Sequence, residues 1–591
     1  MMNLKDILSP FSAWRNLLKE PVTIKDPLTE RPGAPRYRGF HKNDIEKCIG
    51  CGTCETICEN EAIDLVAVAN VDTKNGDSGL RPLVDYGRCC WCALCVDVCT
   101  TGSLTMSNEY TWVSNDPEDF RYIPGVDKKE WDNNDLGWKK PDYTLIPTER
   151  MDMEEMEPSE REGTFLEIVR GYSRAQAEKE ADRCTECGLC VATCPAHMDI
   201  PGYIRAVREG DMEEGLRLLY ETNPLPEICG RVCTHRCEEV CAVGHSGDPL
   251  AIRWLKRYIA DQVPFEEYKR ILGITSIEEN GKKVGIIGAG PSGLSAAYYL
   301  RIRGFEVTIY EAKSKGGGMT MYGIPKYRLP MNMLESEIGF LEEIGVKFVY
   351  ETRVGEDISF DEIYKKHDAV FVGIGFEKPY KINIKGEEQK GALQAISFLD
   401  DINKGKKVDI GKKVAIVGGG NVAMDAARVA RRLGAEVYML YRRRVEDMPA
   451  DSEEIHGAYE EGVQIIPQTI PVEIIGEGGK VKSIQYLMAE MVPDEKGGRP
   501  KPVPIEGSEQ VLEIDTLIGA IGQEADYGFL PQEYLDKIET NRGRMLVDNN
   551  NKTTLDKVYA GGDAVNKTAD AISAIADGHR AADAIERMLL V

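Results

Sequence analysis

Two stretches of the chain repeat one order of apolar and polar positions. The first opens with a short apolar run at Lys283–Ile287, continues into the helical pattern LSAAYYLRIRG and ends in a second apolar run, EVTIYEA. The second begins at Lys413–Val417 and repeats that order up to EVYMLYRRR. Short apolar runs bounded by turn signals are typical of buried strands, so each stretch predicts a strand–turn–helix–strand unit.

Other parts of the chain carry different patterns. From about Glu162 the pattern is helical, in EGTFLEIVRGYSRAQAEKEADRC. Residues 110–160 are acidic and rich in Asp, Glu, Pro and Trp, with weak periodicity, and they predict an extended linker that wraps the surface.

Composition excludes several classes of protein. A chain of 591 residues is too long for one core, so several domains are expected. The net charge of −25 argues against nucleic acid and anionic membrane surfaces as partners. No apolar run is long enough to span a bilayer, and MMNLKDILSPFSAW lacks a secretory pattern, so we expect a cytoplasmic protein. In that reducing compartment, clustered cysteines more often bind metal than form disulfides.

All seventeen cysteines lie at or before Cys241, and sixteen of them form four sets of four. The first two sets share the spacing C-x2-C-x2-C-x3-C of bacterial two-cluster ferredoxins, in which the fourth cysteine of each run ligates the other cluster. The spacing predicts one cluster on Cys48, Cys51, Cys54 and Cys99, and a second on Cys89, Cys92, Cys95 and Cys58. Zinc sites are the alternative, and Cys90 is expected to be a small buried apolar residue.

The lead-in PRYRGFHKNDIEKCIGCGTC and the long gap between these two runs resemble the eight-iron ferredoxin-like subunit of respiratory complex I. The resemblance covers roughly residues 30–105. It implies a domain that passes single electrons between larger partners.

The other two sets are Cys184, Cys187, Cys190 and Cys194, and Cys229, Cys233, Cys237 and Cys241. The segments GYSRAQAEKEADRC, CPAHMDIPGYI and NPLPEICGRVC closely resemble the iron–sulfur domain of glutamate synthase small subunits. Dihydropyrimidine dehydrogenase and the large subunit of NADH-dependent ferredoxin:NADP oxidoreductase share that domain. The resemblance runs from about residue 155 to the C-terminus.

The resemblance implies interleaved ligands. One cluster would use Cys184, Cys187, Cys190 and Cys241, and the other Cys194, Cys233 and Cys237 with a Glu or Gln from the next helix. In PLAIRWLKRY, Lys256 occupies the Glu/Gln position, and an ammonium group has no lone pair to give iron. The fourth ligand is therefore open, with Cys229 as the nearest spare.

Glycines follow the first strand of each repeated stretch. Gly288, Gly290 and Gly293 permit a tight turn and bring backbone N–H groups to a pyrophosphate at the helix N-terminus, and Glu311 at the end of the next strand would hold ribose hydroxyls. An ordinary glycine turn is the alternative. The family resemblance implies that this unit binds FAD, with Gly562 and Asp563 at its ribityl–phosphate region.

The second fingerprint is Gly418, Gly420 and Ala423, and the acid at the end of its second strand is missing. Arg442 and Arg443 stand there instead, and guanidinium groups bind a 2′-phosphate, so NADP(H) is favoured over a solvated basic loop. We predict no catalytic proton donor, because hydride transfer to flavin needs stacking and distance. With no cysteine beyond 241, the flavin is expected to exchange electrons with clusters rather than with a disulfide.

The sequence thus predicts an α/β two-dinucleotide-binding (Rossmann-like) flavoprotein, preceded by a small α+β ferredoxin-like domain and an α-helical iron–sulfur domain. The expected ranges are an N-terminal arm and ferredoxin-like domain (1–110), a linker (111–159), the helical iron–sulfur domain (160–275), the FAD-binding domain in two parts (276–395 and 511–591) and the inserted NADP(H)-binding domain (396–510).

The expected function is electron transfer between NADP(H), FAD and four 4Fe-4S clusters. The expected setting is a hetero-oligomer with other redox subunits and with soluble ferredoxin as a further partner, such as a transhydrogenase. Alternatives are the small subunit of a glutamate synthase-like complex, the electron-input subunit of a hydrogenase or dehydrogenase, and a non-catalytic wiring scaffold.

Overall fold

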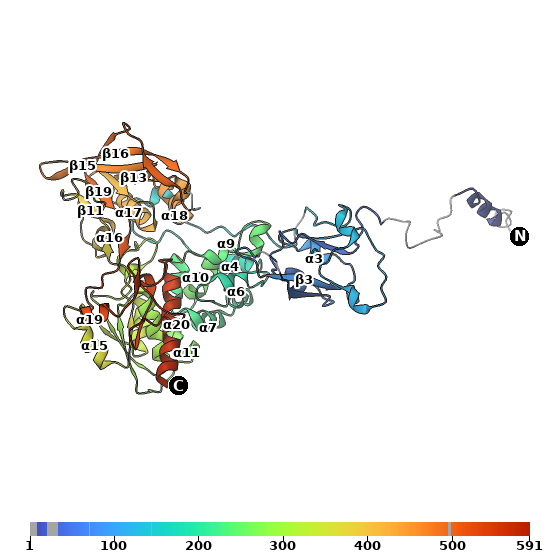
Figure 1. Ribbon diagram of the computed structural model, residues 1–591, viewed down its shortest axis with the longest axis horizontal. Helices are drawn as coiled ribbons and strands as arrows, with labels where there is room; N and C mark the ends of the chain where they lie inside the picture. Colours follow the sequence, from blue (N-terminus) through green and yellow to red (C-terminus); the bar gives the residue numbers. More distant parts are fainter. Residues whose placement is uncertain are drawn as a thin grey trace. The chain divides into compact units, whose positions relative to one another are not determined.

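The computed structural model describes residues 9–19, 33–69, 71, 73–142, 145–494 and 498–590. The chain forms two compact units, which Figure 1 shows in sequence colours. The first unit consists of residues 1–148 with the short segments 185–189 and 242–248, and the second of residues 149–184, 190–241 and 249–591. Much of the predicted N-terminal arm, residues 1–8 and 20–32, lies outside the described residues.

Two small antiparallel sheets and two short helices build the first unit, as an α+β ferredoxin-like domain requires. One sheet pairs β1 with β4, and the other has the order β2-β3-β5. The elements are η1 (Ser9–Asn16), β1 (His41–Asn43), α2 (Thr53–Thr56), β2 (Ile63–Ala67), β3 (Leu80–Asp85), α3 (Leu94–Asp97), β4 (Leu104–Met106), η2 (Pro117–Phe120), β5 (Arg121–Tyr122), η3 (Glu130–Asn133) and η5 (Ala242–His245).

The segment expected as a linker contributes to this unit. Strand β5 extends the sheet by pairing with β3. Trp131 stacks on Phe40 with ring centroids 4.7 Å apart, and Trp112 packs edge-on against Phe40 at 5.7 Å. The structure therefore differs from the predicted boundary at residue 110. Large aromatic side chains carry enough apolar area to order an otherwise acidic segment.

Helices form the part of the second unit that carries the later cysteines. Helix α10 packs against α8 closely, because a Cβ on Gly230 would lie 2.8 Å from the Cα of Arg257. The elements are η4 (Pro158–Glu160), α4 (Arg174–Ala181), α5 (Leu189–Thr193), α6 (Ile200–Glu209), α7 (Met212–Thr222), α8 (Pro226–Val232), α9 (Arg236–Glu239), α10 (Ile252–Gln262), η6 (Phe265–Glu267) and α11 (Tyr268–Ile271).

A parallel five-stranded sheet with the order β23-β9-β6-β7-β8 forms the first dinucleotide fold. Its last strand, β23, returns from the far end of the chain, and α20 after it packs on α12. The elements are β6 (Lys283–Ile287), α12 (Pro291–Ile302), β7 (Glu306–Tyr310), α13 (Met319–Tyr322), α14 (Met331–Glu343), β8 (Lys347–Val349), α15 (Phe360–Lys366), β9 (Ala369–Val372), β10 (Lys378–Pro379), β20 (Gln523–Glu524), α19 (Gln532–Leu535), β21 (Thr540–Asn541), β22 (Arg544–Met545), β23 (Val558–Ala560), η8 (Gly562–Ala564) and α20 (Ala571–Leu590).

The second dinucleotide fold is inserted into the first. Its parallel sheet has the order β11-β19-β12-β13-β14, and an antiparallel sheet of β15 to β18 lies beside it (Figure 1). The elements are β11 (Ala392–Gln394), α16 (Ala395–Asn403), β12 (Lys413–Val417), α17 (Asn421–Arg432), β13 (Glu436–Tyr441), η7 (Val445–Asp447), α18 (Ser452–Glu460), β14 (Gln464–Pro467), β15 (Thr469–Glu477), β16 (Lys480–Val492), β17 (Lys501–Pro504), β18 (Gln510–Glu513) and β19 (Thr516–Gly519).

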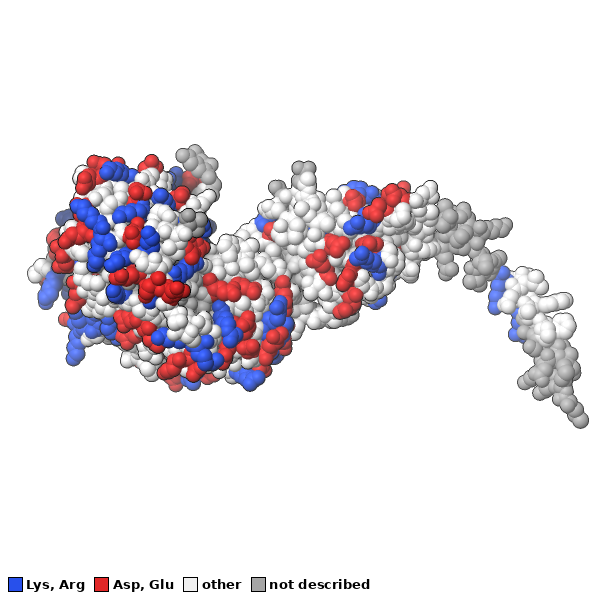
Figure 2. Space-filling model, turned by 90° about the horizontal axis from the view of Figure 1, so that it is seen from below, with Lys and Arg blue, Asp and Glu red and all other residues white. Residues whose placement is uncertain are grey.

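The predicted α/β class with two parallel dinucleotide sheets is confirmed. The inserted sheet extends past the expected range 396–510, through β11 on one side and β19 on the other. Among the helices that the structure describes, none has the length and apolarity to span a bilayer. Figure 2 shows acidic and basic side chains intermingled on the face in view.

Candidate functional site

The turn after β6 has the geometry that a bound pyrophosphate needs. Gly288 has φ +97°, and a Cβ there would lie 2.5 Å from the carbonyl oxygen of Gly373. A Cβ on Gly293 would lie 2.1 Å from the carbonyl oxygen of Gly288, so this position fixes how closely helix and turn approach. At Gly290 the nearest atom to an added Cβ is 3.9 Å away, which leaves open space before the first turn of α12.

Glu311 stands directly after β7 and is only 7% exposed. Its carboxylate accepts hydrogen bonds of 2.8 Å from the backbone N–H groups of Ala289 and Lys313. Burial raises the pKa of Glu311, and those two N–H groups oppose the rise. The carboxylate is thus tied to the glycine turn, at the position where the fingerprint expects ribose hydroxyls.

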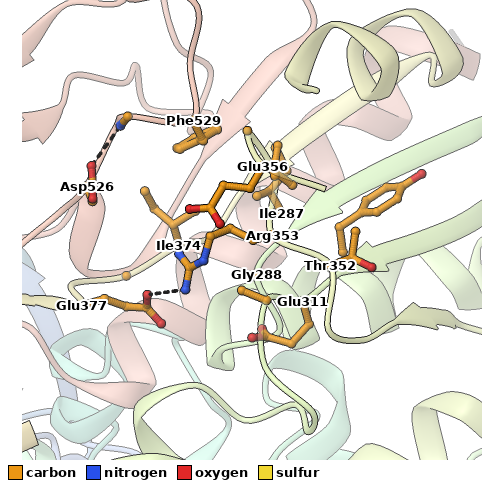
Figure 3. A pocket seen from close by; sticks show the side chains of 16 residues that line it. Ile287, Gly288, Glu311, Thr352, Arg353, Glu356, Ile374, Glu377, Asp526 and Phe529 are labelled. Carbon is orange, nitrogen blue, oxygen red and sulfur yellow. Dashed lines mark hydrogen bonds and ion pairs between the residues drawn. The ribbon is translucent and has the colours of Figure 1, made fainter. Parts of the chain in front are cut away.

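A cavity of about 270 Å³ opens beside Gly288 and Glu311 (Figure 3). Arg353 and Glu377 face each other across it at 3.6 Å, and Phe529 contributes an aromatic wall. The remaining lining comes from the ends of β6 and β7 and from loops after the neighbouring strands. Ligands of open α/β sheets bind at such a crevice outside the carboxyl ends of the strands.

The structure brings the C-terminal motif to the same turn. A Cβ on Gly562 would lie 2.9 Å from the hydroxyl oxygen of Ser292, the second residue of α12. The N–H of Gly562 donates to Asp577 on α20 at 2.9 Å. Burial raises the pKa of Asp563 to about 6, assisted by the charge of Asp570. Two motifs far apart in sequence therefore meet at the start of α12.

The second fingerprint has a similar turn. Gly418 has φ +148°, and a Cβ there would lie 2.3 Å from the carbonyl oxygen of Ala520. Gly420 precedes the first turn of α17, and Ala423 is fully buried within that helix. The side-chain oxygen of Asn421 accepts the N–H of Asp451 at 2.8 Å, which holds the loop before α18 against the start of α17.

The arginines after β13 have different environments. Arg442 is exposed and pairs with no carboxylate in the described part of the chain. Arg443 donates through Nε to the carbonyl oxygen of Pro500 at 2.9 Å. Arg444 forms an ion pair with Asp447 at 2.9 Å. Of the two predicted arginines, Arg442 is therefore the one for which no hydrogen bond is recorded in the described part of the chain, which leaves its N–H groups for a phosphate.

The first predicted cluster set converges in the first unit. Cys48, Cys51, Cys54 and Cys99 line one small apolar cavity. The donor set fits an iron–sulfur cluster, because four sulfur atoms surround a common space.

The second predicted set is also brought together. Burial raises the pKa of Cys95, and the nearby charges of Cys89, Cys92 and Cys58 raise it further. Backbone N–H groups point at these sulfurs: Trp91 donates to Cys89 at 3.4 Å, and Ala62 donates to Cys58 at 3.3 Å. Such N–H···S contacts help to set the reduction potential of a cluster.

His41 is a neighbour of this set that the sequence did not reveal. Its Nε2 lies 3.3 Å from the sulfur of Cys95, and its Nδ1 lies 3.1 Å from the hydroxyl of Tyr86. The ring is 1% exposed, and burial lowers its pKa to about 4, so the imidazole is neutral at pH 7. The only signal was its place in the lead-in GFHKN, seven residues before Cys48.

The expectation for Cys90 is wrong, because its side chain is exposed. The Cys90 side chain faces solvent beside Cys92, with which it forms a side-chain hydrogen bond.

Of the later cysteines, four lie within the second unit beside one lysine. Cys194 and Cys233 are each 7% exposed and Cys229 is fully buried. The charges of Cys233, Cys194 and Lys256 all act on Cys237. The structure thus brings Cys229 together with the three predicted ligands. The other predicted set is divided between the units, with Cys187 in the first and Cys184, Cys190 and Cys241 in the second.

Within the described residues, no three His, Cys, Asp or Glu side chains stand close enough to hold a single metal ion. A single zinc ion draws thiolates to about 2.3 Å of one centre. The ligands of a cluster stand farther apart, around an inorganic core.

Known protein families match three parts of the chain. A 4Fe-4S dicluster domain matches residues 47–103, domain II of dihydropyrimidine dehydrogenase with its 4Fe-4S cluster matches 161–267, and pyridine nucleotide-disulphide oxidoreductase matches 282–578. The last match covers half of the chain.

Individual proteins are similar over most of the chain. The β subunit of NADP(+)-dependent formate dehydrogenase from Moorella thermoacetica is 40% identical over 68% of this chain, which spans 60% of that subunit's length. The small chain of NADPH glutamate synthase from Escherichia coli is 34% identical, with 76% of this chain and 99% of that one covered. The structure of FprA from Mycobacterium tuberculosis in complex with NADPH covers 52% of this chain and 84% of that one, with 18% identity and a TM-score of 0.44.

These matches confirm the resemblance to glutamate synthase small subunits and the presence of ferredoxin-type iron–sulfur domains. The chain belongs to the pyridine nucleotide-disulphide oxidoreductase family, within the group of the glutamate synthase small chains.

Proposed function

We propose that the chain is the electron-transfer subunit of a cytoplasmic, multi-subunit transhydrogenase that couples NADPH to NADH, to ferredoxin or to both. It would exchange a hydride between NADP(H) and FAD and single electrons between FAD and four 4Fe-4S clusters. FAD, when bound, supplies the step from a hydride pair to single electrons.

One ion pair carries this proposal. Arg236 lies between Cys233 and Cys237 and meets Asp570 at 3.3 Å. Asp570 caps α20 by accepting the N–H of Ser573 at 2.8 Å. The ion pair thus ties the loop between Cys233 and Cys237 to the start of α20, and Gly562 and Asp563 lie in the turn that precedes this helix. A short route from flavin to cluster is what single-electron transfer requires.

This chain's own residues would bind and orient the two nucleotides. The turn at Gly288–Gly290 would hold a pyrophosphate through the N–H of Gly290, because the N–H groups of Gly288 and Ala289 already donate to Tyr310 and Glu311. Glu311 would accept hydrogen bonds from ribose hydroxyls. Gly418, Gly420 and Ala423 would shape the corresponding turn for the second nucleotide, with Arg442 and Arg443 reading its 2′-phosphate.

The iron and flavin content of the anaerobically purified chain tests this proposal. We expect one FAD, about sixteen irons and as many sulfides per chain, and bleaching of flavin and clusters by NADPH. About eight irons would mean that two of the four cysteine sets hold no cluster. Absence of flavin absorbance would favour a wiring scaffold that only retains the nucleotide folds.

The similarity to a formate dehydrogenase subunit favours a second candidate, the electron-input subunit of a hydrogenase or dehydrogenase complex. The similarity to the glutamate synthase small chain favours a third candidate, the small subunit of a glutamate synthase-like complex. Identifying the subunits that co-purify with the native protein distinguishes them. Glutamine-dependent oxidation of NADPH would assign the chain to a glutamate synthase. The first unit, with its two predicted clusters (the head), would then have no role in that reaction.

A further inference from the structure

Lys256 is a buried cation in an unusual place. It lies on α10, is 4% exposed, and the side chains whose charges act most strongly on it are Cys233, Cys229, Cys237 and Cys194. An ammonium group in such a nearly dry site costs free energy unless anionic groups lie close to it, and the cysteine sulfurs are the groups that act on it most strongly.

Helix packing brings the backbone of Lys256 close to that of Cys229. Helices α8 and α10 pack tightly at Gly230 and Arg257, where a Cβ on the glycine would lie 2.8 Å from the Cα of the arginine. Cys229 and Lys256 are the residues immediately before these two, and both are buried. The contact therefore fixes the two backbone segments that carry the cysteine and the lysine.

A buried carboxylate that acts on Cys229 is already engaged. Glu337, on α14 of the first dinucleotide fold, is 0% exposed and adds to the charge felt by Cys229. Its two oxygens accept the N–H groups of Glu227 at 2.6 Å and Ile228 at 3.3 Å, which caps the start of α8. Glu337 therefore does not replace the Glu or Gln that the family uses as the fourth cluster ligand.

We propose that Lys256 is a fixed counter-charge that raises the reduction potential of a cluster held by Cys194, Cys229, Cys233 and Cys237. This inference rests on the proposed function, in that it takes these four cysteines as cluster ligands. Reduction adds one electron to a group that is already negative. A cation held beside it at low dielectric stabilises that added charge, and net charge is one of the determinants of cluster potential.

The alternative is that Lys256 only fills space. Burying a charge costs free energy unless it is paired, and a neutral side chain of the same length would fill the space without that cost. The charge itself is therefore the property to test.

The experiment is a redox titration of the holo protein, followed by electron paramagnetic resonance, with dithionite as the one-electron source. Variants are Lys256→Arg, Lys256→Met and Lys256→Glu. The matched control is Lys269→Met, which removes a half-buried lysine that pairs with Glu343 at 2.9 Å. Iron and sulfide are measured on every sample.

We expect one cluster to change its potential in the order of side-chain charge, with Lys256→Arg closest to the original, Lys256→Met lower and Lys256→Glu lowest. The control should leave every potential unchanged. Full iron content with an unchanged potential in Lys256→Met would overturn the inference alone. If the unmodified protein lacks the iron for this cluster, the proposed function fails as well, so the two failures are distinguishable. If Lys256→Met loses iron, the comparison of Lys256→Arg with the original protein decides: loss of iron there too would show a role of shape rather than charge.

Discussion

At the end of strand β13, three consecutive arginines meet different neighbours. Arg443 is held by the carbonyl oxygen of Pro500 and Arg444 by Asp447, whereas Arg442 is exposed. The sequence could place a basic cluster here but could not rank its members, because Pro500 arrives from fifty-seven residues away. The same limit applied to Cys90 and His41, whose environments depend on which way a loop turns.

The first prediction concerns nucleotide preference. Replacing Arg442 by Ala should raise the KM for NADPH about tenfold or more and leave that for NADH nearly unchanged, because a charge-assisted hydrogen bond contributes about 1.5–3 kcal/mol. Steady-state kinetics with both nucleotides measures this. Arg444→Ala is the control, since its guanidinium is already paired. Equal losses for NADPH and NADH in Arg442→Ala would show that this side chain does not read the phosphate.

The second prediction concerns the open ligand position. Cys229→Ser should lose or alter one cluster, because Cys229 is the sulfur beside Cys194, Cys233 and Cys237 while Lys256 has no lone pair to offer. Iron analysis and low-temperature electron paramagnetic resonance measure the change. Lys269→Met is the control, because it changes a side chain of the same unit that pairs with Glu343 and carries no sulfur. An unchanged spectrum in Cys229→Ser would place the ligand on another residue.

At the scale of elements, the order of apolar runs was sufficient to predict both strand–turn–helix–strand units. Strand β6 begins and ends where the first apolar run does, and β12 matches the second. Buried parallel strands are nearly all apolar, so they can be predicted from the local sequence without knowing which strands they pair with. The folded structure of the expected linker could not be predicted in this way, because it depends on Trp112 and Trp131 packing on Phe40, which is distant in sequence.

The third prediction separates two glycines of one turn. Gly293→Ala should destabilise the fold, because its Cβ would lie 2.1 Å from the carbonyl oxygen of Gly288. Gly290→Ala should fold normally but lose FAD, because its Cβ enters the space left for the pyrophosphate. Thermal unfolding and flavin content of the two variants measure the difference. Full FAD occupancy in Gly290→Ala would contradict the assignment of this turn to the pyrophosphate.

On the scale of the whole molecule, two clusters in the first unit would serve as the outlet to a partner. Deleting the residues before about 150 would not remove this unit cleanly and so would not test its role, because segments 185–189 and 242–248 also belong to it. Ser246 donates to the carbonyl oxygen of Thr100 at 2.6 Å, and the N–H of Asp248 donates to that of Thr148 at 2.8 Å. Removing the head would therefore expose both segments.

The fourth prediction uses a point variant instead. Cys54→Ser should remove the cluster expected in the cavity with Cys48, Cys51 and Cys99, while NADPH still reduces FAD and an artificial dye. Electron exchange with ferredoxin or the native complex should fall sharply, because the relay is interrupted. Assays of the reconstituted complex measure this, with Lys269→Met, far from the cysteines in sequence, as the control. Undiminished physiological activity would make the head a structural cap.

The interleaved make-up of the first unit also constrains how the protein is made. A translating ribosome releases the chain from the N-terminus, and domains generally fold as units during synthesis. Here Thr100 and Thr148 must wait for Ser246 and Asp248 before their hydrogen bonds can form. The first unit therefore completes these contacts only after about a hundred residues beyond Thr148 have emerged, whereas the residues that line the pocket of its first cysteine set all lie before Thr148.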